Sequence, residues 1–316
     1  MKQFILYVKK IFDNSPAGLC GRAGLLIAFL LFIFMVKALL QPDKIGPYPH
    51  DLSLYPTITV EDSAQLSRIL KKEKLWDIAA DSSIKPVIFK NFPKDIKQLD
   101  IETRKKIFLH TLLPAVLLAE EEIKWEKRAL NLVRLRLGQE WGQEPFLRNN
   151  QDWQVRFTDS EVEFIISLTK KYRTADPEEL ARRIDILPVS LVLAQGALES
   201  SWGTSRFALE GNSLFGVWTW GNDGIVPEHR DADKTHRVAD YNSLFDSVRA
   251  YLLNLNRMEV YAKLRQLRQN SDDSIVLSSG LLYYSIRRYD YVKDVRLVID
   301  HNDLKEYDRC RLDDLF

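Results

Sequence analysis

The feature that most limits how this chain can fold is a run of twelve residues without a charge, LPVSLVLAQGAL, from Leu187 to Leu198. A helix built from this run is apolar on every side, so it has to be almost completely buried. Pro188 suits the first turn of such a helix. Gly203, a few residues past its end, is expected to end it in a left-handed cap. The sequence therefore predicts a nearly buried helix in the second half of the chain.

The composition fits a folded globular protein of one large domain or two modest ones, with 316 residues, 46% hydrophobic and 28% charged. Its 45 basic and 44 acidic residues give a net charge of +1, so no global basic field favours nucleic acid, which we exclude as a partner. Cys20 and Cys310 lie almost a chain length apart, without a Cys or His cluster beside them. We therefore expect no cofactor and no metal.

The N-terminus contains a candidate membrane span over residues 19–40. The run from Ala23 to Val36 has no charge, and Arg22 and Lys37 lie near the ends, where long basic side chains can reach the interface. Residues 1–18 carry a basic excess, which predicts a cytoplasmic segment and places the rest of the chain in the periplasm. A cleaved signal peptide is the alternative, although no small-residue cleavage pattern closes the apolar run.

Two folded regions are expected after a proline-rich tether over residues 41–57. We expect residues 58–150 to form a mostly helical N-terminal region and residues 151–316 to form a second domain. The pattern in the first region predicts a helix over 61–75, a short strand over 85–92, and a helix over 101–137 that Pro114 kinks or splits. The charged residues between 120 and 128 indicate a solvated helix surface.

Local signals mark the elements of the second region. Thr158 and Glu161 form a capping box, and Asp176 with Pro177 is typical of a helix start. Three short strand-like pieces separated by turn signals predict a β-lobe, over 217–220, 225–230 and 235–241. Helical spacing then predicts three more helices, one that Ser243 caps and that runs to Met258, one over 272–284 and one over 291–302.

Glu199 lies where the uncharged helix ends, directly before Ser200, Ser201 and Trp202. Burial, the partial negative charge of the helix C-terminus and the water excluded by the tryptophan all favour a raised pKa for this carboxyl. A general acid needs such a retained proton. The alternative is that Glu199 marks the polar edge of the helix and pairs with Arg206.

The run AQGALESSWGTSRFALEGNSLFGVW, residues 194–218, resembles the glucosaminidase family of peptidoglycan hydrolases, glycoside hydrolase family 73, and in particular its Bax-like branch. The resemblance continues through YNSLFDSVRAYLLNLN and YSIRRYDYVKDVRLVIDHNDL and covers roughly residues 155–305. It implies an α+β, mainly α, fold with a lysozyme-like helical lobe, a small β-hairpin lobe and a sugar groove between them. The glutamate of the ALES motif is the general acid of that family, which assigns this role to Glu199.

The second catalytic group is less well defined. Glu228 lies roughly where some family members place a second glutamate, but Pro227 and the short hairpin depart from their threonine-threonine-glutamate-tyrosine pattern. An N-acetylated substrate can instead supply its own acetamido oxygen as the nucleophile. The resemblance also assigns Tyr291 to a tyrosine that lines the active site, with Val292 replacing the commoner alanine.

Flat aromatic rings are suited to stacking on sugars. Trp218 and Trp220 precede a glycine turn and are expected in the groove, whereas core packing is favoured for Trp202 and Phe215. His229 and His236 lack a third metal ligand, so no metal site is expected there. The candidate substrate-binding residues are Trp202, Asn212, Phe215, Trp218, Trp220, Tyr284 and Tyr289.

Taken together, the sequence predicts a membrane-anchored periplasmic glycosidase that cleaves the β-1,4 bond after N-acetylglucosamine in peptidoglycan strands, with Glu199 as the acid. Two alternatives remain open. One is a muramidase or lytic transglycosylase, since lysozyme-like folds also place one glutamate at the end of a buried helix. The other is a non-catalytic cell-wall-binding scaffold that keeps the groove.

Overall fold

The computed structural model describes residues 45–48, 55–142, 156–219, 223–228 and 235–313. Residues 45–316 form one compact unit, distinct from residues 1–44. The expected cytoplasmic segment, the expected membrane span 19–40 and much of the expected tether lie outside the described residues. In the described part of the chain, no helix combines the length and the hydrophobicity that crossing a membrane requires.

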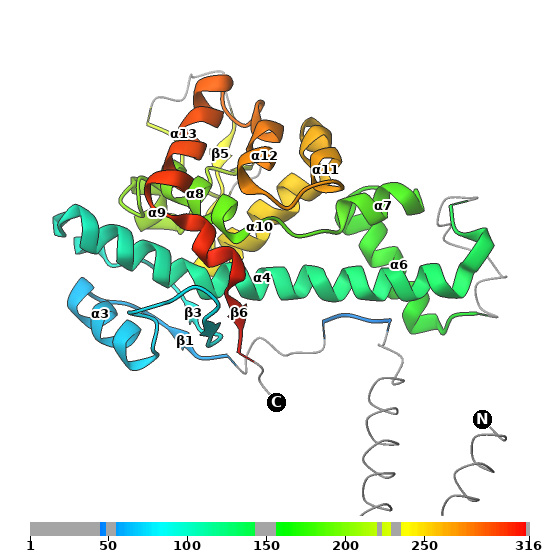
Figure 1. The fold of residues 1–316 in the computed structure, drawn as a ribbon, viewed down its shortest axis with the longest axis horizontal. Coiled ribbons are helices and arrows are strands. Elements are labelled where there is room, and N and C mark those ends of the chain that lie inside the picture. The colour runs from blue at the N-terminus through cyan, green and yellow to red at the C-terminus, as the bar shows by residue number, and fades with distance from the viewer. Residues whose placement is uncertain (1–44, 49–54, 143–155, 220–222, 229–234, 314–316) are drawn as a thin grey trace, which may run out of the picture. The chain divides into compact units, whose positions relative to one another are not determined.

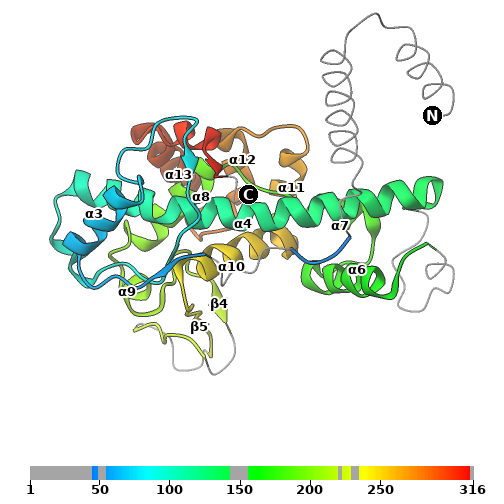
Figure 2. The same ribbon diagram turned by 90° about the horizontal axis from the view of Figure 1, so that it is seen from below.

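One long helix, α4 (Ile101–Leu137), runs the length of this unit and contacts elements from both halves of the chain (Figures 1 and 2). Of the kink or split predicted at Pro114, the split is wrong, because α4 continues through this residue. A proline inside a helix costs about 3 kcal/mol. Here all residues from Ile107 to Glu120 are buried. Burying one large apolar side chain contributes about 1.5–3 kcal/mol, so the packing of several offsets the proline.

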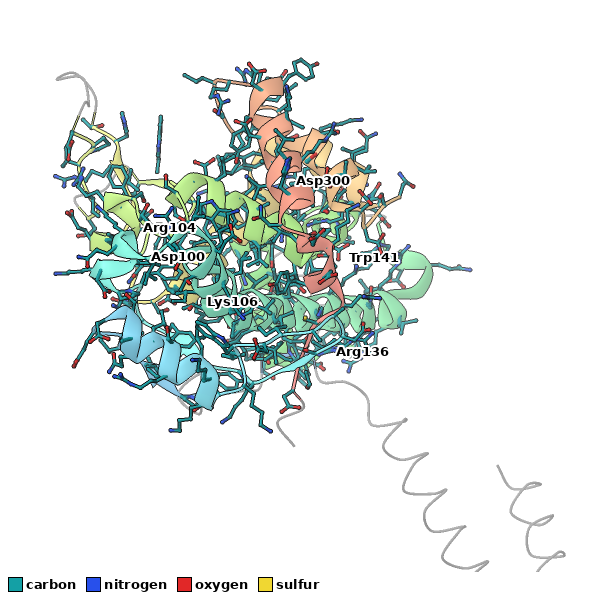
Figure 3. All side chains as sticks on the ribbon, turned by 60° about the vertical axis from the view of Figure 1, so that its left-hand side comes forward. Asp100, Arg104, Lys106, Arg136, Trp141 and Asp300 are labelled. Atoms are coloured by element: carbon teal, nitrogen blue, oxygen red, sulfur yellow. The ribbon has the colours of Figure 1, made fainter. Side chains whose placement is uncertain are left out.

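Side chains at the two ends of α4 fix it in place (Figure 3). Asp100 caps the N-terminal end, where its Oδ1 accepts a hydrogen bond from the backbone N–H of Thr103 at 3.0 Å. Near the other end, Arg136 pairs with Glu161 at 2.9 Å. The α4 helix is thereby connected to the helix that begins at Asp159.

Short parallel strand pairs connect distant segments. β1 (Thr57–Ile58) pairs with β3 (Ile88–Phe89), which confirms the core of the predicted strand over 85–92. β2 (Ser83–Ile84) pairs with β6 (Arg311–Leu312), so the described C-terminal end lies against the N-terminal region. The α3 helix (Ser63–Lys72) confirms the predicted helix over 61–75.

The helices with clear start signals form where they were predicted. α6 (Asp159–Tyr172) begins with the capping box, in which Glu161 accepts from the backbone N–H of Thr158 at 2.9 Å. α7 (Pro177–Arg183) has Asp176 as its N-cap. α8 (Val189–Ser200) is the predicted buried helix, with Pro188 as its N-cap. The side chains of Thr158 and Asp176 satisfy free N–H groups, which explains why the starts of α6 and α7 are readable from sequence.

The prediction of three strands in the β-lobe is wrong for its middle piece. In the described residues the lobe is a small antiparallel hairpin of β4 (Trp218–Thr219) and β5 (Arg237–Val238), and Ile225 adds only one bridge to Val238. The chain is therefore a mainly helical α+β protein, as predicted. The predicted helix over 272–284 is a short α-helix followed by a 3-10 turn. Two further helices, α9 and α11, were not predicted. The remaining helices are α9 (Arg206–Gly211), α10 (Leu244–Arg257), α11 (Ala262–Arg268), α12 (Ser274–Ser278) and α13 (Tyr289–His301).

The charged stretch of α4 differs from the predicted solvated surface. Glu120, Glu122 and Glu126 are all buried. Glu122 accepts a hydrogen bond from Arg249 of α10 at 2.7 Å, and Glu126 accepts one from Lys171 of α6 at 2.7 Å. The pattern was misread because i to i+4 spacing of charges cannot reveal that other helices later cover them. These ion pairs connect α4 to α6 and α10.

Glu120 gives this unit a testable dependence of stability on pH. Burial raises the pKa of Glu120 to about 8 against an ordinary 4.5. The folded state then binds a proton that the unfolded state releases, so stability falls by about 1.4 kcal/mol per pH unit from the ordinary pKa up to pH 8. Glu120→Gln removes this loss. The unfolding free energy of Glu120→Gln minus that of the wild type should therefore increase by about 2 kcal/mol from pH 6 to pH 8.

Urea unfolding at pH 6, 7 and 8, followed by tryptophan fluorescence, measures this difference. The matched control is Glu121→Gln, which changes the more exposed neighbouring carboxylate that pairs with Lys124 at 2.8 Å. This control should track the wild type at every pH. A constant gap between Glu120→Gln and the wild type would contradict the prediction.

Candidate active site

The α8 helix carries the candidate acid, and it is the most deeply packed helix of the site. Ten of its twelve residues are buried, against α4, α12, α13 and the 3-10 helix Leu304–Arg309. Gly196 allows the closest approach, since a Cβ there would lie 3.2 Å from Leu112 of α4 and 3.3 Å from Phe215. At the opposite end, Asp308 accepts hydrogen bonds from the backbone N–H and the hydroxyl of Ser190 at 2.7 and 2.8 Å. The N-terminal end of α8 is therefore held by hydrogen bonds, and its interior by close packing.

Glu199 lies in the last turn of α8 with a partly buried side chain. Desolvation by burial raises the pKa of its carboxyl above the ordinary value, and a hydrogen bond with Tyr291 lowers it by a smaller amount. The alternative pairing with Arg206 is not what the structure shows, because Arg206 pairs with Glu210 at 3.3 Å and Glu228 at 3.0 Å. A carboxyl with this environment can hold a proton for transfer.

Four aromatic side chains near Glu199 pack on one another. The ring of Tyr284 stacks on that of Tyr291 with centroids 5.4 Å apart, and Tyr251 stacks on Phe215 at 4.0 Å. The hydroxyl of Tyr284 donates to the backbone carbonyl of Phe215 at 2.7 Å. Tyr291 and Phe215 are both buried. The structure therefore places the predicted Tyr291 beside Glu199. Tyr284 packs on Tyr291 and hydrogen bonds to Phe215.

The turn after Glu199 has three consecutive residues in the left-handed region: Ser201 at φ 52°, Trp202 at φ 59° and Gly203 at φ 78°. Ser201 is the C-cap of α8, so the prediction that Gly203 caps the helix is wrong by two residues. The Trp202 ring packs edge-on against Phe108 of α4, with centroids 5.7 Å apart. This contact confirms the preference for core packing and holds a bulky residue in a conformation that sterics disfavour.

The other candidate substrate-binding residues have different surroundings. Trp218 is 55% exposed on β4, and its ring stacks on His236 at 4.4 Å. Tyr289 is 77% exposed at the start of α13. The Asn212 amide donates to the backbone carbonyl of Tyr241 at 2.9 Å, which gives it a structural role at the end of α9. Trp220 lies outside the described residues.

Glu228 lies on the surface of the β-lobe, with a side chain that is 69% exposed and 3.0 Å from Arg206. Its described contact is thus with α9 and not with Glu199. The described residues contain no group of three or more His, Cys, Asp or Glu side chains placed to hold a metal ion.

Two residues of the site were missed from the sequence. Gln195 is fully buried one turn before Glu199, and its amide donates to the hydroxyl of Tyr291 at 2.7 Å. Tyr251 of α10 donates its hydroxyl hydrogen bond to the same amide. The signal for Gln195 was present: it is a polar residue within an uncharged helix, and its i to i+4 spacing places it on the same helix face as Glu199. Nothing local distinguishes Tyr251 from a core tyrosine.

Comparison with known proteins agrees with this description. Residues 175–304 match the family model described as "Glucosaminidase: Mannosyl-glycoprotein endo-beta-N-acetylglucosaminidase". Protein bax of Escherichia coli (strain K12) is 30% identical over 166 residues, which cover 52% of this chain and 55% of that protein. The chain thus matches about half the length of this relative. The catalytic domain of the autolysin Auto from Listeria monocytogenes is similar at 23% identity, with a TM-score of 0.32 over 51% of this chain and 90% of that one.

The match supports a glycoside hydrolase over residues 175–304, and the predicted resemblance to the glucosaminidase family is confirmed.

The turn after Glu199 gives a prediction for stability. Gly203→Ala places a side chain in the left-handed region and brings its Cβ to 3.2 Å from the rings of Phe92 and Phe108. We expect a loss of about 1–3 kcal/mol in unfolding free energy. The control is Gly46→Ala, where nothing lies within 4 Å of the added Cβ. Urea unfolding of both variants measures the difference, and equal stabilities would contradict this explanation of the turn.

Proposed function

We propose that this protein is a peptidoglycan hydrolase that cleaves the β-1,4 bond after N-acetylglucosamine, with Glu199 as the general acid. The observation that supports this proposal most directly is the environment of Glu199. Its carboxyl ends the buried α8 helix, burial raises its pKa, and Tyr291 hydrogen bonds to it. The glucosaminidase match over residues 175–304 supports the class of bond.

In the proposed reaction, protonated Glu199 transfers its proton to the leaving glycosidic oxygen while the bond to the anomeric carbon breaks. The carboxylate that results then accepts the hydrogen bond of Tyr291, which stabilises its negative charge. Because the pKa of Glu199 is raised, its proton is retained to a higher pH than that of an ordinary glutamate. Activity should therefore be lost as the pH rises above the pKa of Glu199.

We propose a lysozyme-like arrangement in which the glycan lies between the helical lobe around α8 and the β4–β5 hairpin. The Trp218 ring stacks on His236 at 4.4 Å and is 55% exposed, and we propose that its exposed part packs on a sugar face. Such stacking requires an exposed ring, which the buried Phe215 does not offer.

For the second catalytic role, we propose the acetamido oxygen of the substrate. The described contact of Glu228 is an ion pair with Arg206, and its side chain is 69% exposed. A carboxylate that attacks or activates water has to lie across the bond from the acid, about 5–9.5 Å away. The described contacts of Glu228 do not support that position, whereas an N-acetyl group is part of the substrate itself.

We also propose that residues 19–40 anchor the chain in the membrane, with the catalytic domain in the periplasm, where the wall substrate lies. The uncharged run from Ala23 to Val36 and its basic flank support this orientation. Secretion after signal cleavage is the alternative, and the mass of the mature chain distinguishes the two.

Digestion of purified murein by the full-length chain in mild detergent tests the proposal. Mass spectrometry should find fragments that end in reducing N-acetylglucosamine. Glu199→Gln keeps the shape of the side chain without its acidic proton, and we expect it to lower the rate by about 10²–10⁴-fold. The control Glu163→Gln alters an exposed residue of α6 and should leave digestion unchanged.

Other products would overturn parts of the proposal. Muramic acid or anhydro-muramic acid ends would identify a muramidase or a lytic transglycosylase. Binding of the wild type to murein without release of fragments would identify a wall-binding scaffold. Wild-type rates in Glu199→Gln would exclude this residue as the acid.

Glu228→Gln tests the second role in the same assay. If the substrate supplies the nucleophile, this variant loses only its contact with Arg206. We then expect digestion within about fivefold of the wild type, since an exposed ion pair contributes at most about 1 kcal/mol. Glu210→Gln is the matched control, because Glu210 is the other partner of Arg206. A loss as large as that of Glu199→Gln would assign a catalytic role to Glu228.

A further inference from the structure

Gln195 connects the candidate acid to two other helices. It is fully buried on α8, one turn before Glu199. Its Nε2 donates to the hydroxyl of Tyr291 on α13 at 2.7 Å, and its Oε1 accepts from the hydroxyl of Tyr251 on α10. Tyr251 is itself completely buried. Tyr291 hydrogen bonds to Glu199, so four side chains form one chain of hydrogen bonds.

The direction of each hydrogen bond in this chain follows from the orientation of the Gln195 amide and from how many protons each group has. A tyrosine hydroxyl has one proton, and an amide has a donor side and an acceptor side. Because Tyr251 gives its proton to Oε1, the amide presents its N–H side to Tyr291. The oxygen of Tyr291 then accepts, and its own proton is left for the carboxylate of Glu199. With the amide reversed, Oε1 would face Tyr291 and compete for that proton.

This inference rests on the proposed role of Glu199 as the acid. We propose that Gln195 and Tyr251 are positioning residues, which orient the hydroxyl proton of Tyr291 toward Glu199. Their effect is needed after the acid has given up its proton, when the carboxylate left in a half-buried place needs a donor. Neither residue touches the substrate in this proposal, so both act through Tyr291.

Four tyrosines interact electrostatically with Glu199, namely Tyr251 of α10, Tyr261 of the 3-10 helix before α11, Tyr284 of the turn after α12, and Tyr291 of α13. Burial raises the pKa of Tyr261 to about 12 and holds the pKa of the other three well above the ordinary value. All four are neutral at physiological pH. A change at Tyr251 therefore alters hydrogen bonding to Glu199 and not the charge around it.

The experiment follows the Glu199 carboxyl directly, without any need for substrate. The full-length chain is labelled with ¹³C at the glutamate carboxyls, and the resonance that disappears in Glu199→Gln identifies Glu199. In Tyr251→Phe we expect the pKa of Glu199 to rise by about one unit, which makes it a tenfold weaker acid, because Tyr291 no longer donates to it reliably. The basic limb of the pH profile of murein digestion should move in the same direction.

Two variants make the assignment specific. Tyr261→Phe removes a hydroxyl from the same group of rings but from outside the hydrogen-bond chain, so the pKa of Glu199 should stay at the wild-type value. In a Tyr291→Phe background, Tyr251→Phe should add no further rise, because the link to Glu199 is already broken. Gln195→Met removes both hydrogen bonds of the side-chain amide and keeps a similar volume. It gives a second test if Tyr251→Phe does not fold.

An unchanged Glu199 pKa in a folded Tyr251→Phe or Gln195→Met chain would overturn the proposal, as would an equal rise in Tyr261→Phe. The outcome is separable from that of the proposed function. A rise in pKa without murein digestion by the wild type would retain the hydrogen-bond chain and refute the activity. Murein digestion by the wild type together with an unchanged Glu199 pKa in Tyr251→Phe would retain the activity and refute the role of the hydrogen-bond chain.

Discussion

The site depends on one balance, between the desolvation of the Glu199 carboxyl and the hydrogen bond that Tyr291 gives it. Desolvation follows from the depth of α8, which Gly196 allows to approach α4 so closely that an added Cβ would be 3.2 Å from Leu112. If α8 were less deeply packed, water would reach the carboxyl and favour its charged form. Without Tyr291, the carboxylate would lack a donor once the proton had left. Desolvation raises the pKa of Glu199 and the hydrogen bond from Tyr291 lowers it, and both effects come from the packing of the helices.

Much of that packing comes from outside the segment that matches the glucosaminidase family. The α4 helix begins and ends before residue 175, yet it covers α8 and α10 and contacts Trp202 through Phe108. The pairing of β2 with β6 then brings the end of the described chain back to the N-terminal region. The N-terminal helical region therefore contributes to the packing that excludes water from α8.

The sequence predicted those parts of the structure whose causes are local. The capping box at Thr158, the start at Pro177 and the uncharged helix before Glu199 each depend on residues within a few positions of one another, and all three are confirmed. The errors have distant causes. Whether a helix continues through Pro114, and whether Glu120 is solvated, depend on which helices later cover α4, and spacing within α4 contains no record of them.

The same distinction separates the residues of the site. Glu199 was predicted because the charge pattern changes abruptly at the residue itself, and Tyr291 because the family motif contains it. Gln195 required a different argument: a polar side chain in an otherwise apolar buried helix costs about 1–3 kcal/mol unless a partner satisfies it. Its burial therefore implies partners on neighbouring helices, and the structure supplies Tyr251 and Tyr291. An isolated polar residue within an uncharged helix, one turn from a candidate acid, is thus a signal for a positioning group even where its partners cannot be named from the sequence.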